Sequence, residues 1–142
     1  MKKIVKAVLI LMVTLSFVVV LASCSRISED PLKIVKELDK ASYDSQIAVD
    51  SSDLEEFADE LEIREEDIEW MIVIESEEWD SYDEIGILIY CKNYKTAKEM
   101  QQDLENYADE NEDLLEEIKR PVIERQGKYV FLGAEKIWLE LK

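Results

Sequence analysis

Residues 84–92 read EIGILIYCK and are apolar at almost every position. Successive side chains of an extended chain point to opposite faces of a sheet, so Ile87 and Leu88 would lie on different faces. A strand that is apolar on both faces is typical of the centre of a sheet that is covered by helices. We therefore expect residues 84–92 to form a central strand.

Other segments around this run have the patterns of strands. Residues 69–75 alternate between two apolar faces. Residues 121–125 and 128–132 flank Gln126-Gly127, which is the pattern of a hairpin with a tight turn. Residues 46–49 are a weaker candidate for extended structure.

Several segments have the spacing of amphipathic helices. Asp30 before Pro31 is typical of a helix start, and Ser52 with Glu55 has the pattern of a capping box. A polar residue, Asn111, falls on the apolar stripe of the longest helix, so we expect a break there. The expected helices cover residues 31–41, 52–61, 93–110, 114–118 and 134–141.

These elements predict an α+β fold. We expect a small single domain over residues 31–142, with about four mostly antiparallel strands and with helices packed on one face of the sheet. After the first 23 residues the chain is long enough for one folded domain and too short for two.

The amino terminus has the pattern of an export signal. Residues 1–6 are basic, and residues 7–22 form an uncharged apolar run, which is shorter than the about 20 residues of a membrane span. The run ends in Leu21-Ala22-Ser23-Cys24, which resembles a bacterial lipobox. This resemblance implies cleavage before Cys24 and attachment of a diacylglyceryl group to Cys24. The alternative is an uncleaved amino-terminal anchor helix.

The lipobox divides the chain into three parts. Residues 1–23 would be a cleaved lipoprotein signal peptide, residues 24–30 a lipid-anchored tether, and residues 31–142 the folded domain. The protein would then lie on the extracytoplasmic face of the cell membrane, held by the lipid on Cys24, because two or more acyl chains give stable attachment.

The charge balance limits the possible partners. The chain has 34 acidic and 17 basic side chains. Without Lys2, Lys3 and Lys6 of the signal peptide, 14 basic side chains remain and the formal charge is −20. Binding to nucleic acid requires clustered Lys and Arg, so nucleic acid is excluded as a partner, and an anionic membrane surface would repel the domain. The excess of acidic side chains favours a basic protein segment, a cationic peptide or cell-wall-associated cations as the partner.

The chain contains no histidine. This excludes Ser–His–Asp and Cys–His catalysis and zinc sites with His ligands. The three glycines, Gly86, Gly127 and Gly133, do not have the spacing of a calcium loop or a phosphate-binding loop. We interpret Cys91, at the end of the central strand, as a small buried hydrophobic residue. No catalytic residue, metal ligand or cofactor is therefore predicted.

The connection between residues 69–75 and the central strand reads EEWDSYDE. Trp79, Asp80, Tyr82 and Asp83 would hold a cationic group by charge and by cation–π contact. The alternative, which we favour, is a connecting loop whose aromatic side chains fold back over the sheet edge.

A series of short motifs resembles a family of small lipoproteins from Gram-positive bacteria, catalogued as domain of unknown function 4358. The similarity covers residues 32–133, although the segment after Tyr107 departs from the family pattern. The resemblance implies a lipoprotein and its fold, and it carries over no activity and no catalytic residue. The motifs are residues 54–61, Ile63, residues 66–69, residues 83–85, the long helix and residues 127–130.

From the sequence we expect a non-enzymatic binding or protein-interaction module with a strongly acidic surface. It would use an exposed sheet face or the loop around Trp79 and Tyr82 to engage an extracytoplasmic protein or a cationic ligand. One alternative is a small-solute or cation-binding lipoprotein. A second alternative is an enzyme with a carboxylate-based site.

Overall fold

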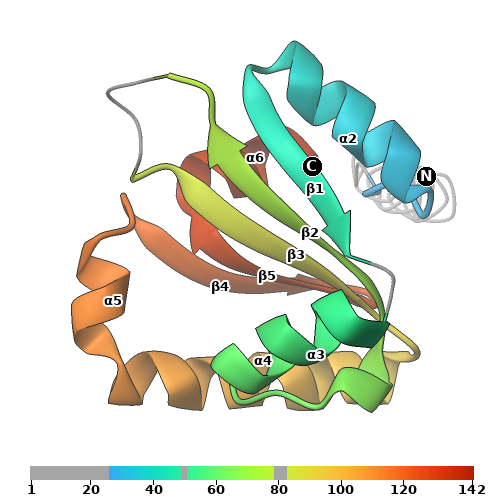
Figure 1. The fold of residues 1–142 in the computed structure, drawn as a ribbon, viewed down its shortest axis with the longest axis vertical. Helices are drawn as coiled ribbons and strands as arrows, with labels where there is room; N and C mark the ends of the chain where they lie inside the picture. Colours follow the sequence, from blue (N-terminus) through green and yellow to red (C-terminus); the bar gives the residue numbers. More distant parts are fainter. Residues whose placement is uncertain (1–25, 49–50, 79–82) are drawn as a thin grey trace, which may run out of the picture.

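Strands and helices are interspersed along residues 26–48, 51–78 and 83–142, which the computed structural model describes (Figure 1). Each expected element is present within a few residues of its predicted bounds. The strands are β1 (Tyr43–Ala48), β2 (Ile68–Ser76), β3 (Ile85–Cys91), β4 (Pro121–Gln126) and β5 (Tyr129–Ala134). The helices are α2 (Pro31–Lys40), α3 (Ser51–Glu60), the short 3-10 helix η1 (Glu65–Asp67), α4 (Tyr94–Glu110), α5 (Glu112–Glu116) and α6 (Glu135–Leu141).

β3 is the central strand of the sheet, as the apolar run predicts. The strand order is β1-β2-β3-β5-β4, and every neighbouring pair is antiparallel. The α+β fold class is therefore confirmed, with five strands where about four were expected. The additional strand, β1, has a weak sequence pattern because Asp44, Ser45 and Gln46 interrupt it, and its pairing with β2 determines its conformation.

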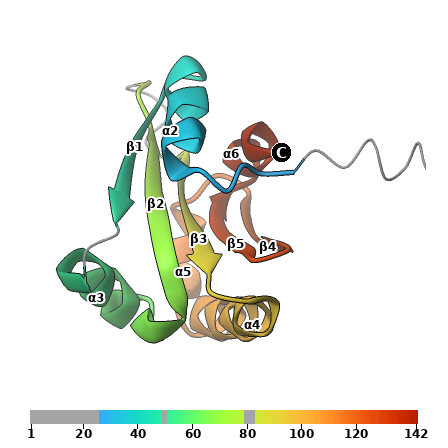
Figure 2. The same ribbon diagram turned by 90° about the vertical axis from the view of Figure 1, so that its right-hand side faces the viewer.

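Helices cover both faces of the sheet, which corrects the expectation of helices on one face. α2 and α6 pack with Leu88 and Phe131 on one face, whereas α3 and α4 pack with Met71 and Ile89 on the other. Figure 2 shows α3 and α6 on opposite sides of the sheet. The physical reason is the alternation along β3, because the adjacent side chains of Leu88 and Ile89 are both fully buried and each face needs a cover.

The packed part of the chain begins before α2. Asp30 caps this helix as predicted, since its Oδ1 accepts a hydrogen bond from the Leu32 N–H at 3.0 Å. Further upstream, Ile27 belongs to the hydrophobic cluster of α2 and α6, and the Tyr129 hydroxyl donates a hydrogen bond to the Ser28 carbonyl. Part of the segment that the sequence assigns to a tether is thus packed on the domain.

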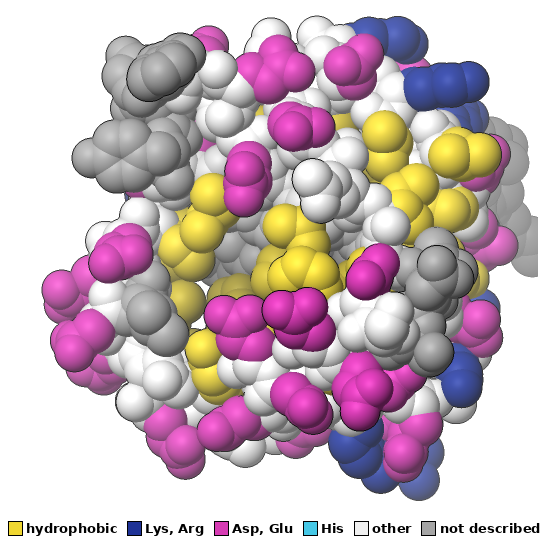
Figure 3. All heavy atoms as spheres, in the orientation of Figure 1, with side chains coloured by type: hydrophobic (Ala, Val, Ile, Leu, Met, Phe, Trp, Pro, Cys, Tyr) yellow, Lys and Arg dark blue, Asp and Glu magenta, His cyan; other side chains and the backbone are white. Residues whose placement is uncertain are grey.

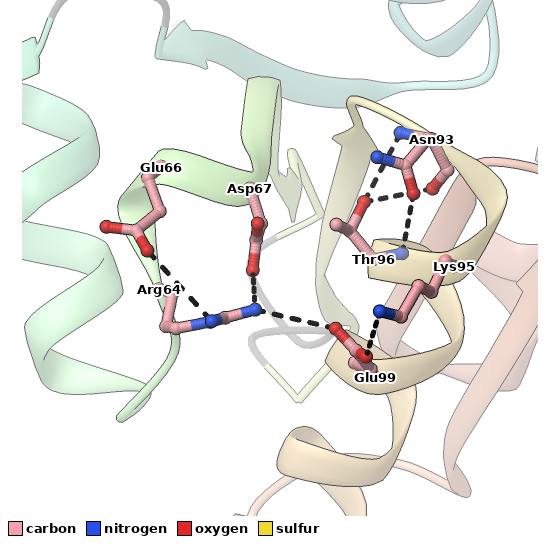
Figure 4. A network of polar contacts seen from close by, with 7 residues as sticks. All are labelled: Arg64, Glu66, Asp67, Asn93, Lys95, Thr96 and Glu99. Carbon is pink, nitrogen blue, oxygen red and sulfur yellow. Dashed lines mark hydrogen bonds and ion pairs between the residues drawn. The ribbon is translucent and has the colours of Figure 1, made fainter.

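Polar contacts fix the start of α4 (Figure 4). Asn93 and Thr96 form a capping box, in which the Asn93 Oδ1 accepts from the Thr96 N–H at 2.9 Å and the Thr96 Oγ1 accepts from the Asn93 N–H at 3.2 Å. The Arg64 guanidinium lies 2.6 Å from Asp67 and 3.4 Å from Glu99. These contacts link η1, which follows α3, to α4 on the same face of the sheet.

β3 and β5 approach closely at Gly86 and Gly133, which pair in register. A Cβ atom on Gly133 would lie 2.3 Å from the Gly86 Cα and 2.5 Å from the Ile85 carbonyl oxygen. A Cβ atom on Gly86 would lie 2.7 Å from the ring of Phe131. The two glycines therefore make room for the fully buried Phe131 ring.

We expect Gly133→Ala to lower the free energy of unfolding by about 2–4 kcal/mol, because the added Cβ meets backbone atoms and the backbone φ of +156° strains any side chain. Urea unfolding followed by circular dichroism measures this loss. Gly127→Ala is the matched control, since its φ of +60° is also strained but its Cβ would lie 3.5 Å from Tyr94, an ordinary contact. The control should lose about 1 kcal/mol, and equal losses would contradict the close approach of β3 and β5.

Candidate functional site

One half of the sheet face under α3 and α4 is well covered. The register aligns Ala48, Met71, Ile89 and Val130 in a row across β1, β2, β3 and β5. Ala48 is 5 % exposed and the other three are fully buried. They form one hydrophobic cluster with side chains of α3 and α4, including Leu104. This row marks the part of the face that the helices protect.

The next row across the same face is only partly covered. The register joins Gln46, Val73, Ile87, Leu132 and Ile123 across all five strands. Leu132 is buried, Val73, Ile87 and Ile123 are half-buried, and Gln46 is exposed. The sheet thus presents an apolar floor that neighbouring helices do not close.

Asp44, Glu75 and Ile85 form the outermost row on this face, and all three are exposed. Asp44 and Glu75 lie directly opposite each other on neighbouring strands. Within the described residues neither carboxylate forms an ion pair. Like charges in directly opposed positions destabilise a sheet, whereas a cation beside them would relieve the repulsion. The row is therefore suited to contact with a positively charged group.

We refer to the uncovered residues of this face as the open sheet face. Figure 3 shows hydrophobic side chains in a hollow at the middle of the face, with carboxylates around them. Where the face meets α3, a cavity of about 180 Å³ is lined by Val73, Phe57 and Asp53, among others. The open sheet face consists of Asp44, Gln46, Val73, Glu75, Ile85, Ile87 and Ile123.

The predicted ligand loop is described only at its end. Trp79, Asp80 and Tyr82 lie outside the described residues. Asp83 is half-buried, and its carbonyl oxygen accepts a hydrogen bond from the Lys119 backbone N–H at 2.9 Å. Its Oδ1 is buried and has no hydrogen-bond partner in the described part of the chain. The cation-binding role of the loop stays a prediction.

Glu84 is the one buried charged side chain among the described residues, and its residue type does not predict its burial. The Lys136 Nζ lies 3.0 Å and 3.3 Å from its two carboxylate oxygens, and the Lys119 Nζ lies 3.6 Å from Oε1. The Tyr43 hydroxyl donates to Oε2 at 3.3 Å. Segments from β1, α6 and the start of β4 therefore meet at one carboxylate. The signal in the sequence for the burial of Glu84 is its spacing. It lies two residues before Gly86, so its side chain points to the same face as Leu88, which α2 and α6 cover.

The environment of Glu84 keeps its side chain ionised. Burial raises the pKa of Glu84, but the hydrogen bond from Lys136 and the charges of Lys136 and Lys119 outweigh burial, so the pKa lies below its usual value. The same hydrogen bond raises the pKa of Lys136. A carboxylate that stays ionised is a poor proton donor near neutral pH. Glu84 is therefore suited to holding the end of the sheet together.

Cys91 is fully buried, which confirms its interpretation as a small hydrophobic residue. Burial and, secondarily, the charge of Asp67 raise the pKa of the Cys91 thiol to about 12. The thiol therefore stays protonated and unreactive at neutral pH. In residues 26–48, 51–78 and 83–142, no group of three or more acidic or Cys side chains is placed to hold a metal ion.

Comparisons with known proteins give no match. No protein family matches the chain, and no curated protein or solved structure is significantly similar to it. None of the helices that the structure describes is both long and apolar enough to cross a membrane. The lipoprotein resemblance and the lipid on Cys24 stay predictions.

We expect Glu84→Gln to lower the free energy of unfolding by about 1–3 kcal/mol at neutral pH, because two ammonium groups lose a buried counter-charge. The pKa of Glu84 is lower in the folded state than the about 4.3 of an unfolded chain. Its contribution is therefore complete above the unfolded pKa and is lost as the pH falls through the folded pKa. Urea unfolding over this pH range should show that the free energies of unfolding of the wild type and the variant converge as the pH falls.

Glu60→Gln is the control for this experiment, since Glu60 is an exposed acid on α3. A surface change of this kind should alter the free energy of unfolding by less than about 0.5 kcal/mol. A Glu84→Gln variant that is as stable as this control at neutral pH would show that the buried carboxylate is not stabilising.

Proposed function

We propose that this protein is a non-enzymatic binding module that is anchored to the extracytoplasmic face of the cell membrane by a lipid on Cys24. The open sheet face binds a basic, amphipathic helix of a partner protein. The observation that carries this proposal is the half-buried apolar floor of Val73, Ile87 and Ile123 beside the exposed carboxylates of Asp44 and Glu75, which form no ion pair with any described residue.

A helix fits this face because helices already cover its other half. α3 and α4 bury the row that contains Met71 and Ile89, and the next row remains half-buried. One more helix beside them would extend the same layer. Its apolar side would contact Val73 and Ile87, and Lys or Arg on its flank would meet Asp44. Docking of an amphipathic helix into an apolar groove is a recurrent mode of peptide recognition.

The charge of the chain supports a basic partner. The sequence carries twice as many acidic as basic side chains. The electrostatic field of this net negative charge attracts cationic segments and raises their association rate. On the open sheet face, Asp44 and Glu75 hold two of these charges next to the exposed Ile85. The field brings the partner to the protein, and the apolar floor retains it.

The binding prediction concerns the two carboxylates. Residues 26–142 contain both hydrophobic clusters, so the experiment uses this part of the chain, without the apolar amino terminus. A synthetic amphipathic helix of Leu and Lys, titrated by calorimetry, should bind an Asp44→Asn, Glu75→Gln variant about three- to tenfold more weakly than the wild type at low salt. Ile85→Ser should weaken binding about tenfold through lost apolar contact.

The control removes the same number of charges elsewhere. Asp39 on α2 and Glu140 on α6 are exposed acids that lie outside the open sheet face. An Asp39→Asn, Glu140→Gln variant should keep most of the affinity. Equal weakening of both double variants would show general attraction to an acidic protein, and this result would refute the open sheet face as the binding site.

The anchoring prediction concerns Cys24. Replacement of Cys24 by Ala should block lipid attachment and leave an unprocessed precursor, because the lipobox cysteine receives the lipid before cleavage. Cell fractionation and immunoblotting measure the size and location of the product. Release of wild type and variant as the same mature soluble protein would mean that residues 21–24 do not act as a lipobox.

A further inference from the structure

The chain near the proposed lipid anchor leaves little free length. Ile27 is 6 % exposed in the core, and the Tyr129 hydroxyl holds the Ser28 carbonyl. Only Ser25 and Arg26 separate Cys24 from Ile27, so the Cα atoms of Cys24 and Ile27 are at most about 11 Å apart. If the lipid is attached to Cys24, the anchor keeps the surface around Ile27 within reach of the bilayer, and the side chains of that surface determine whether it docks.

This surface is richer in cations than the rest of the chain. Two cavities of about 250 and 260 Å³ share Arg26 and Ile27. Lys33 and Lys142 line the first cavity, and Lys128 lines the second. With Arg26 they are four cations beside three acids, whereas acids outnumber cations two to one in the whole sequence.

The acids of this surface do not cancel its cations. They are Glu29, Glu37 and Glu140. Glu37 forms an ion pair with Lys40 at 2.8 Å, which removes much of its effect on a ligand. The side chains that line the two cavities therefore carry a formal charge of +1, in contrast to −17 for the whole sequence.

Exposed apolar side chains accompany these cations. Leu32, Tyr94 and Leu139 are 64 %, 67 % and 62 % exposed. Tyr94 lines the second cavity, whereas Leu32 and Leu139 are neighbours in sequence of Lys33 and Glu140, which line the first. In the described part of the chain, the one other exposed large hydrophobic residue is Ile85 of the open sheet face, which is only 36 % exposed. Tyr and basic side chains together are typical of positions at the level of lipid headgroups.

We propose that this surface docks onto anionic lipid headgroups, and the proposal rests on the lipid anchor described above. Ile27 packs with α2 and α6, on the sheet face opposite to α3 and α4. Figure 2 shows the first described residues running past α6, away from α3. Docking there turns the open sheet face away from the bilayer and leaves it accessible to a partner.

The overall charge does not prevent this contact. An anionic bilayer would repel the domain if the net charge acted as one quantity. Charges that are more than about 10 Å from the bilayer are largely screened at 0.1 M salt. The nearby cations Arg26, Lys33, Lys128 and Lys142 therefore determine the interaction.

Fluorescent labels on two cysteine variants test the proposal. Tyr94→Cys places a label on the proposed docking surface, and Gln46→Cys places one on the open sheet face, while the buried Cys91 stays unlabelled. The full lipidated protein is reconstituted into phosphatidylcholine vesicles that contain phosphatidylglycerol and a lipid with a nitroxide headgroup. The label at position 94 should be quenched, and the label at position 46 should not.

Charge reversal then tests the role of the cations. Lys33→Glu should reduce the docked fraction about fivefold. Lys98→Glu, an exposed lysine on α4, should leave it unchanged. Omission of phosphatidylglycerol should also abolish quenching at position 94.

Flotation of the vesicles separates the possible failures. Protein that does not float with the vesicles would overturn the lipid anchor and, with it, the docking proposal. Protein that floats but is quenched equally at positions 46 and 94, or equally without phosphatidylglycerol, would overturn the docking surface and leave the anchor intact.

Discussion

The apolar character of β3 on both faces is the constraint on which the rest of the structure depends. Leu88 and Ile89 are adjacent, fully buried and on opposite faces, so the sheet needs a helical layer on each side. α2 and α6 provide one layer and α3 and α4 the other. In this small domain the layer of α2 and α6 covers its face of the sheet. The layer of α3 and α4 covers only one row of side chains on the other face, and Val73 and Ile87 in the next row remain half-buried. The candidate binding face is thus a direct result of covering a two-sided sheet with a short chain.

The distribution of charge gives the domain one acidic surface and one surface where cations gather. Glu84, the buried acid of the described residues, is neutralised by Lys136 and Lys119, and the unpaired carboxylates of Asp44 and Glu75 lie on the surface. Cations gather instead around the point where the chain enters the domain. Net charge describes attraction at a distance, but contact depends on charges within about one Debye length. An acidic domain can therefore present a basic surface to one partner and an acidic surface to another.

The sequence predicts the elements of this fold because their patterns are local. The alternation of Ile87 and Leu88 and the capping residue Asn93 can be identified within a few positions. The site depends on distant residues and is less predictable. Glu84 meets Lys136 only after α6 packs on the sheet, 52 positions along the chain. The exposure of Val73 likewise depends on where α3 and α4 end relative to the strands, which no local pattern determines.

The pairing of Gly86 with Gly133 also concerns the order of events during folding. The β2–β3 and β4–β5 pairs join strands that are neighbours in the sequence, whereas the β3–β5 pair joins residues 39 to 47 positions apart. Closing such a long loop has an entropic cost that local contacts do not repay. A chain that emerges amino terminus first therefore exposes the apolar edge of β3 until β5 has emerged. The core on the α2–α6 face is complete only when Ile137 and Trp138 of α6 have followed.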